Sequence, residues 1–160
     1  MKIIGIDPGL VQTGYGIISI ENDTPQIVDF GVVKPDRESS LSNRLYTIFE
    51  DISHLIGEYN PSVFSIEDVF YGKNVKSALK LGQARGAAMV AAASAGLSIH
   101  EYSAKKIKQA VTGNGNAQKE QVQFMVKTYL KMNELPHPMD ASDALATALC
   151  HFQQFRLAEL

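Results

Sequence analysis

The sequence contains a single cysteine, Cys150, among its 160 residues. An internal disulfide is therefore impossible, and a metal site built from several cysteines is excluded. No apolar stretch approaches the roughly 20 residues that a membrane-spanning helix needs. The first residues run directly into a strand-like pattern and lack the long apolar region and cleavage site of a secretory signal. These absences predict a cytoplasmic protein.

A strong excess of charge of one sign is also missing, because the formal net charge is only −2. The charges are nevertheless unevenly distributed: 73–131 carries ten basic residues against two acidic ones, whereas 1–72 carries four against eleven. This asymmetry is typical of a phosphate-binding face, although solvated helix surfaces would also produce it. From this basic segment we select five candidate nucleic-acid contacts: Lys73, Lys76, Lys80, Arg85 and Lys105.

Hydrophobic periodicity predicts both strands and helices. Short apolar or alternating runs predict strands at 3–6, 15–20, 26–33, 63–66 and 97–102. Apolar residues at helical spacing predict helices at 41–59, 77–95, 103–111, 117–131 and 140–155, the third of them capped by Ser103. Hairpins first and strand–helix–strand crossovers afterwards imply a mixed α/β sheet with helices on both faces. Without internal repeats or linkers, 1–160 is expected to form one domain.

Four acidic residues occupy positions that favour a shared site. Asp7 ends the first predicted strand and Glu67 ends the fourth, and such strand ends line the ligand crevice of open α/β sheets. Asp140 and Asp143 lie three residues apart at the start of the last helix, so they share a face. Each also has a simpler interpretation: a turn residue at Asp7, a solvated strand end at Glu67, a helix cap at Asp140 and a favourable helix dipole for Asp143.

The surroundings of these acids predict that they are partly buried, because apolar strand residues precede Asp7 and Glu67 and small residues surround Asp143. Several buried like charges are costly unless cations neutralise them. Mg²⁺ prefers hard oxygen ligands, and two such ions in one site can support phosphodiester hydrolysis. We therefore predict a Mg²⁺ site of two ions, in which Mn²⁺ could substitute, on Asp7, Glu67, Asp140 and Asp143.

Several motifs in their order resemble the RuvC family of bacterial Holliday-junction resolvases, which are ribonuclease H-like nucleases. The resemblance runs from residue 3 to about 151 and is most specific at 77–86, which reads SALKLGQARG. It also includes GIDPG at 5–9, TGYG at 13–16, KQ at 108–109, KEQV at 119–122 and DASDALA at 140–146.

The resemblance implies a ribonuclease H-like fold with a five-stranded mixed sheet, and a homodimer that nicks two opposing strands of a four-way DNA junction. Asp7, Glu67, Asp140 and Asp143 would be its catalytic, metal-binding acids. Lys108 and Lys119 match basic positions near the site, Phe70 matches an aromatic residue that contacts bases, and helix 77–95 matches the dimer interface. A branch-migration helicase complex is implied as a partner. Asp68 and His137 depart from the expected pattern: Asp68 could perturb metal affinity or point to solvent, and His137 could approach the metals or be an ordinary loop residue.

Three other functions are compatible with parts of the sequence. The segment 5–14 also resembles the first phosphate loop of the actin and sugar-kinase group, but that group needs two such domains around its nucleotide. No P-loop sequence is present. Another ribonuclease H-like nuclease, acting on RNA or on other DNA structures, would use the same acids. A non-catalytic DNA-binding protein is disfavoured by the presence of all four.

Overall fold

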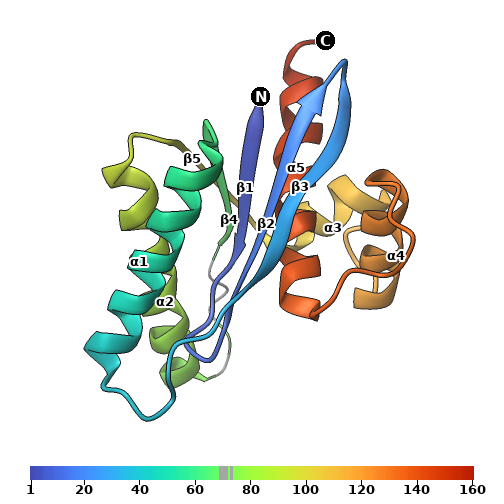
Figure 1. The fold of residues 1–160 in the computed structure, drawn as a ribbon. Coiled ribbons are helices and arrows are strands. Elements are labelled where there is room, and N and C mark those ends of the chain that lie inside the picture. Colours follow the sequence, from blue (N-terminus) through green and yellow to red (C-terminus); the bar gives the residue numbers. More distant parts are fainter. Residues whose placement is uncertain (69–71, 73) are drawn as a thin grey trace.

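The computed structural model describes residues 1–68, 72 and 74–160, which form five strands and five helices (Figure 1). In chain order these are β1 (Lys2–Asp7), β2 (Thr13–Glu21), β3 (Thr24–Val33), α1 (Leu41–Tyr59), β4 (Val63–Glu67), α2 (Val75–Ser94), β5 (Ser98–Tyr102), α3 (Ala104–Thr112), α4 (Lys119–Tyr129) and α5 (Met139–Ala158). The strands form one sheet in the order β3-β2-β1-β4-β5. β1 pairs antiparallel with β2 and parallel with β4, which confirms the predicted mixed sheet.

The helices form a layer on each side of the sheet (Figure 1). α1 and α2 cover one face, and α5 covers the other with α3 and α4 packed outside it. The alternation of side chains along β1 supplies both cores, because Ile4 and Ile6 pack under α1 and α2 whereas Ile3 packs towards α5. In β1, odd-numbered side chains therefore face α5 and even-numbered ones face α1 and α2.

Local capping explains where several helices begin. The side chains of Ser40, Asn74 and Ser103 accept hydrogen bonds from backbone N–H groups in the first turns of α1, α2 and α3, which confirms the predicted Ser103 cap. Helix α4 is shorter than the predicted 117–131, because its first turn begins only at Lys119 and Lys131 has a positive φ of 52°. None of the helices in the described parts of the chain is long and apolar enough to cross a membrane.

Helix α5 lies unusually close to the strands beneath it. A Cβ atom added at Gly5 in β1 would lie 2.1 Å from the carbonyl oxygen of Ala144, and one at Gly14 in β2 would lie 2.0 Å from that of Asp140. Both distances are far inside van der Waals contact, so the strands approach the helix backbone only because these two side chains are absent. On α5, the small side chains of Ala144 and Ala148 face the strands and also permit this close approach.

The Gly5→Ala substitution is therefore expected to lower the free energy of unfolding by about 1–3 kcal/mol or more, because the added methyl group forces α5 away from β1. Denaturation in urea measures the change. The matched control is Gly57→Ala in α1, where no atom lies within 4 Å of the added Cβ. The control should be neutral or stabilising by up to about 1 kcal/mol. Equal stability of the two variants would contradict this account of the packing.

Candidate active site

Strands β1 and β4 bring Asp7 and Glu67 to the same edge of the sheet. The two strands run parallel with Ile6 opposite Ile66, and each acid is the next residue in its strand. Strand alternation places both side chains on the face covered by α5, as it does for Ser65, whose hydroxyl donates to the Thr147 carbonyl of α5. Asp7 and Glu67 therefore lie side by side, at the ends of neighbouring parallel strands.

The N-terminal part of α5 adds Asp140, in its first turn, and Asp143, in its second, to this edge. One carboxylate oxygen from each of Asp7, Asp140 and Asp143 lies within 4.8 Å of the other two. Glu67 is outside this tight group but lines the same hollow as the other three acids. All four predicted acids therefore meet in one place, although they come from three elements.

The suggestion that Asp140 merely caps the helix is wrong. The residue at the cap position is Pro138, and no side chain makes a capping hydrogen bond there. The Asp140 carboxylate instead accepts a hydrogen bond from the Gln12 side-chain amide, in the loop between β1 and β2. Sequence reasoning missed Gln12, because nothing in its local pattern marks it as a partner of a residue so far along the chain.

Crowding and burial disfavour negative charge on these acids. Burial, followed by the charges of Asp143, Glu67 and Asp140, raises the pKa of Asp7 to about 8. Burial is also the main cause of the raised pKa of Glu67 and of Asp143. The site therefore favours a bound cation, and its hard oxygen donors are those that Mg²⁺ prefers.

Two predicted lysines border the acids. Lys108 of α3 and Lys119 of α4 line the hollow, and the Lys119 ammonium lies 3.9 Å from a carboxylate oxygen of Asp143. Their positive charges oppose the rise in the pKa of Glu67 and Asp143 without cancelling it. With 69% of its side chain exposed, Lys119 also remains accessible to a phosphate entering the site.

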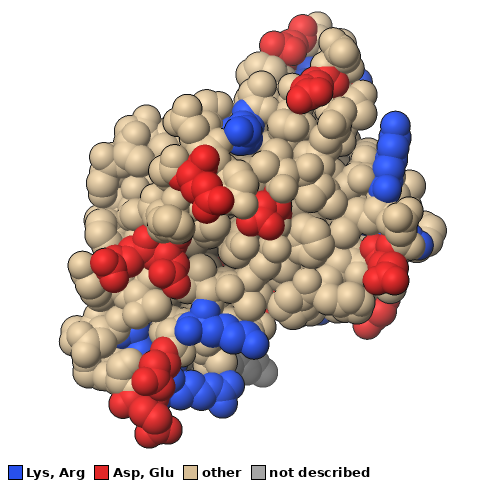
Figure 2. Space-filling view, in the orientation of Figure 1, with Lys and Arg blue, Asp and Glu red and all other residues tan. Residues whose placement is uncertain are grey.

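The other predicted nucleic-acid contacts that the structure describes do not line the hollow of the four acids. Lys76 and Lys80 are exposed on α2, and Lys105 is exposed on α3. Phe70 and Lys73 lie outside the described residues. On the face seen in Figure 2, basic and acidic side chains are intermixed, so the charge asymmetry of the sequence produces no single-sign surface there.

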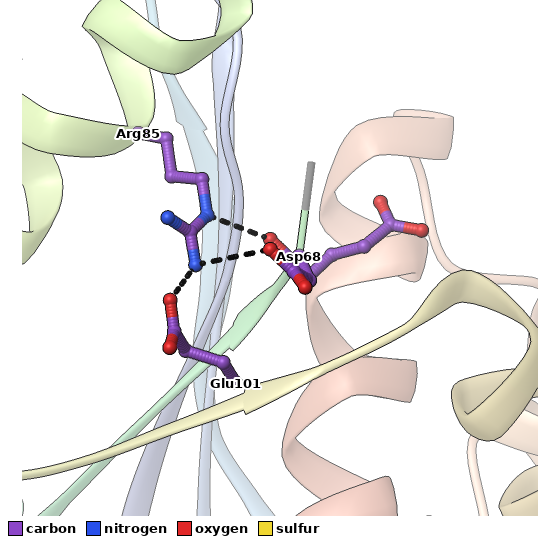
Figure 3. A network of polar contacts seen from close by, with 4 residues as sticks. Asp68, Arg85 and Glu101 are labelled. Carbon is purple, nitrogen blue, oxygen red and sulfur yellow. Dashed lines mark hydrogen bonds and ion pairs between the residues drawn. The ribbon is translucent and has the colours of Figure 1, made fainter. Parts of the chain in front are cut away.

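Asp68 and His137, the two departures from the expected pattern, do not line the hollow of the four acids. Asp68 forms an ion pair with Arg85, whose guanidinium lies 3.6 Å from it. His137 lines a separate hollow beside Phe30 and Met132. Arg85 itself is largely enclosed, with 14% of its side chain exposed, and it also pairs with Glu101 (Figure 3).

The mixed sheet with clustered acids at the ends of β1 and β4 is the arrangement of ribonuclease H-like nucleases. The family model described as "Crossover junction endodeoxyribonuclease RuvC" matches residues 3–151. The chain belongs to the RuvC family. Among curated relatives of that name, the Citrifermentans bemidjiense protein is 52% identical over 151 residues, which cover 94% of this chain and 92% of the relative. The Marinobacter nauticus protein is 52% identical over 149 residues, covering 93% and 84%.

Solved structures agree with this assignment. Thermus thermophilus RuvC in complex with a Holliday junction substrate matches with a TM-score of 0.93 and 32% identity, over 99% of this chain and 96% of that one. The yeast mitochondrial Holliday junction resolvase matches with a TM-score of 0.69 and 14% identity, over 98% and 82%, which shows a common fold. The predicted ribonuclease H-like fold is confirmed.

In the absence of divalent cations, the Asp7→Asn substitution is expected to stabilise the folded protein. The folded-state pKa of Asp7, about 8, lies above the ordinary 3.8, so ionisation opposes folding increasingly as the pH rises from 4 to 8. Because Asn cannot ionise, the free energy of unfolding of the variant should exceed that of the parent by at least about 1 kcal/mol at pH 8. Urea denaturation in EDTA at pH 5 and pH 8 measures it. A gain that does not grow with pH would contradict the electrostatic account.

Proposed function

We propose that this protein is an endonuclease that resolves four-way (Holliday) DNA junctions by paired, symmetrical nicks in recombination and repair. The observation that carries the proposal is the meeting of Asp7, Asp140 and Asp143 within 4.8 Å, beside Glu67, in a chain of the RuvC family. The complex of the T. thermophilus relative with a Holliday junction supports junction DNA as the substrate. Hydrolysis is expected to leave 5′-phosphate and 3′-hydroxyl ends.

Asp7, Glu67, Asp140 and Asp143 would hold the divalent cations, two Mg²⁺ ions in our proposal. The raised pKa of three of these acids and their all-oxygen chemistry support this assignment. When bound there, Mg²⁺ would supply Lewis-acid chemistry, which lowers the pKa of water and offsets charge on the leaving oxygen of a phosphodiester. The acids would orient the cations, and Ile107 and Val122 form an apolar wall beside them.

The two lysines of the hollow would act on the substrate. Lys119 lies in the first turn of α4 and Lys108 in α3, and both line the hollow. An ammonium group there can hold a phosphate oxygen and stabilise the negative charge that develops on it during hydrolysis. Lys76, Lys80 and Lys105, which are exposed, are proposed to contact DNA further from the site. Phe70 and Lys73 remain proposals from the sequence.

Helix α2 supports a homodimer. Its exposed face carries a stripe of Leu79, Gly82, Gly86 and Val90, and the side chains of Leu79 and Val90 are 64% and 57% exposed. A Cβ added at Gly82 or Gly86 would meet no atom within 4 Å, so packing within the protomer does not require either glycine. Since glycine weakens a helix interior by about 1 kcal/mol relative to alanine, close approach of a second α2 helix is the better explanation.

We further propose one nuclease domain over 1–160, since α5 near the end of the chain packs on β1 at its start. A cytoplasmic location and cooperation with a branch-migration helicase complex are proposed from the family alone. The rival substrates are RNA and other DNA structures, since the same acids would serve any of them. A nucleotide-binding module remains the non-nuclease rival.

The substrate is tested by incubating the protein with a synthetic four-way junction, matched linear duplex and RNA–DNA hybrid, with Mg²⁺ or EDTA. Paired nicks in the junction, dependent on Mg²⁺ and sealed by ligase, are expected. The Asp7→Asn variant should lose cleavage by about 10²-fold or more while it retains junction binding, because lysines carry the affinity. Preferential cleavage of the hybrid or the duplex would contradict the proposed substrate. Normal cleavage by the Asp7→Asn variant would contradict the proposed site.

The dimer is tested with Gly82→Leu. An added Cβ meets no atom within 4 Å in the protomer, so stability in urea, measured at concentrations where the parent is monomeric, should be unchanged or raised by up to about 1 kcal/mol. The added side chain would obstruct a partner helix, and sedimentation should show dissociation at concentrations where the parent protein is dimeric. The control is Gly57→Ala on α1, which should sediment as the parent does. A Gly82→Leu protein that remains as dimeric as the parent would contradict this interface.

A further inference from the structure

The end of strand β4 is tied to helix α2 by a single side chain (Figure 3). Arg85 extends from α2, and its Nε donates a hydrogen bond to the backbone carbonyl of Glu67 at 3.2 Å. Its terminal nitrogen pairs with a carboxylate oxygen of Asp68 at 3.6 Å and with the carboxylate of Glu101 on β5. Two groups at the end of β4 and just beyond it, and one from β5, therefore converge on one guanidinium.

These contacts argue against Arg85 as a phosphate ligand. Two carboxylates already neutralise its charge, and only 14% of its side chain is exposed. Lys80, five residues earlier on the same helix, is exposed and is better suited to DNA. The planar guanidinium instead does what a lysine cannot, since it binds a carbonyl and two carboxylates at once from fixed directions.

The backbone that Arg85 holds carries one of the four acids. Glu67 lies opposite Tyr102 in β5, and the next residue, Asp68, donates its backbone N–H to the Tyr102 carbonyl at 2.8 Å. The Glu67 side chain lies on the other face of the sheet, in the hollow with Asp7 and Asp143. Its backbone is thus held from α2 and from β5, while its carboxylate faces the acids under α5.

This backbone support matters more for Glu67 than for the other acids. Asp7, Asp140 and Asp143 lie within one tight group, and Asp140 is also held by Gln12. Glu67 is outside that group, and among the described residues no hydrogen bond to its carboxylate is present. The place of its carboxylate is therefore set by its backbone and side-chain torsions.

We propose that Arg85 is a positioning residue that fixes Glu67 for divalent-cation binding and links the site to helix α2. The inference rests on the proposed function for the identity of the site. It also joins two features of α2: the stripe with Gly82 and Gly86 on its exposed side, and Arg85 next to buried Ala84 and Ala88 on its inner side. A movement of α2 would carry the guanidinium, and with it the end of β4.

The test uses the full chain with Arg85→Met, which removes the charge and keeps much of the length. Mn²⁺ binding, followed by the electron paramagnetic resonance of the free ion, reports on the site without requiring activity. The dissociation constant for Mn²⁺ should rise by about 10–100-fold, which is typical of losing a partner that orients metal ligands. Junction affinity in EDTA should stay within about twofold of the parent, and the single-turnover rate at limiting Mg²⁺ should fall.

Two further variants separate positioning from general damage. Arg85→Lys retains one ion pair but not the convergent set, so its Mn²⁺ affinity should lie between those of the parent and Arg85→Met. Arg156→Met is the matched control, because Arg156 also pairs with a carboxylate, Asp23 at 2.9 Å, but does not line the acid hollow. The control should bind Mn²⁺ as the parent does, which would show that loss of an arginine ion pair alone has no such effect.

Either of two results would overturn the inference. Parent-like Mn²⁺ affinity in both Arg85 variants would show that the guanidinium does not position the site. The second result is normal Mn²⁺ binding by the Arg85 variants together with a junction affinity reduced more than tenfold and a salt dependence lower by about one phosphate contact. That result would make Arg85 a DNA ligand. The Mn²⁺ measurement separates this inference from the proposed function, since a parent protein that binds Mn²⁺ but leaves junctions uncut would contradict only the substrate.

Discussion

The close contact between helix α5 and strands β1 and β2 is the constraint on which the active site depends. The backbone of α5 lies so near Gly5 and Gly14 that neither position has room for a Cβ atom. At this distance, the first two turns of the helix place Asp140 and Asp143 beside Asp7 at the end of β1. A larger separation would leave the acids too far apart to share a cation.

This arrangement opposes the folding of the metal-free chain. Burial in the hollow, together with repulsion between the like charges that meet there, raises the pKa of Asp7 to about 8. The apolar cores on both faces of the sheet offset that cost, with Ile4, Ile6 and Phe64 fully buried on one side and Leu145 and Leu149 on the other. The fold thus tolerates an electrostatic defect where a cation is needed, as active sites commonly do.

The sequence predicts what depends on local pattern. The positions of Asp7 and Glu67 at the ends of two predicted strands correctly assigned them to one edge of the sheet, and helical spacing assigned Asp140 and Asp143 to one face of α5. It could not predict the contact of Gln12 with Asp140 or those of Arg85, because these contacts join residues far apart in the chain and depend on how the layers pack. Arg85 was selected for its charge, which its neighbours Asp68 and Glu101 neutralise.

The central claim is that Asp7, Glu67, Asp140 and Asp143 form one cation site, and anomalous diffraction from crystals grown with Mn²⁺ tests it most directly. The account predicts anomalous density in the hollow between β1, β4 and the first turn of α5, within coordination distance of these carboxylates. Density at other surface acids with none in this hollow would contradict it.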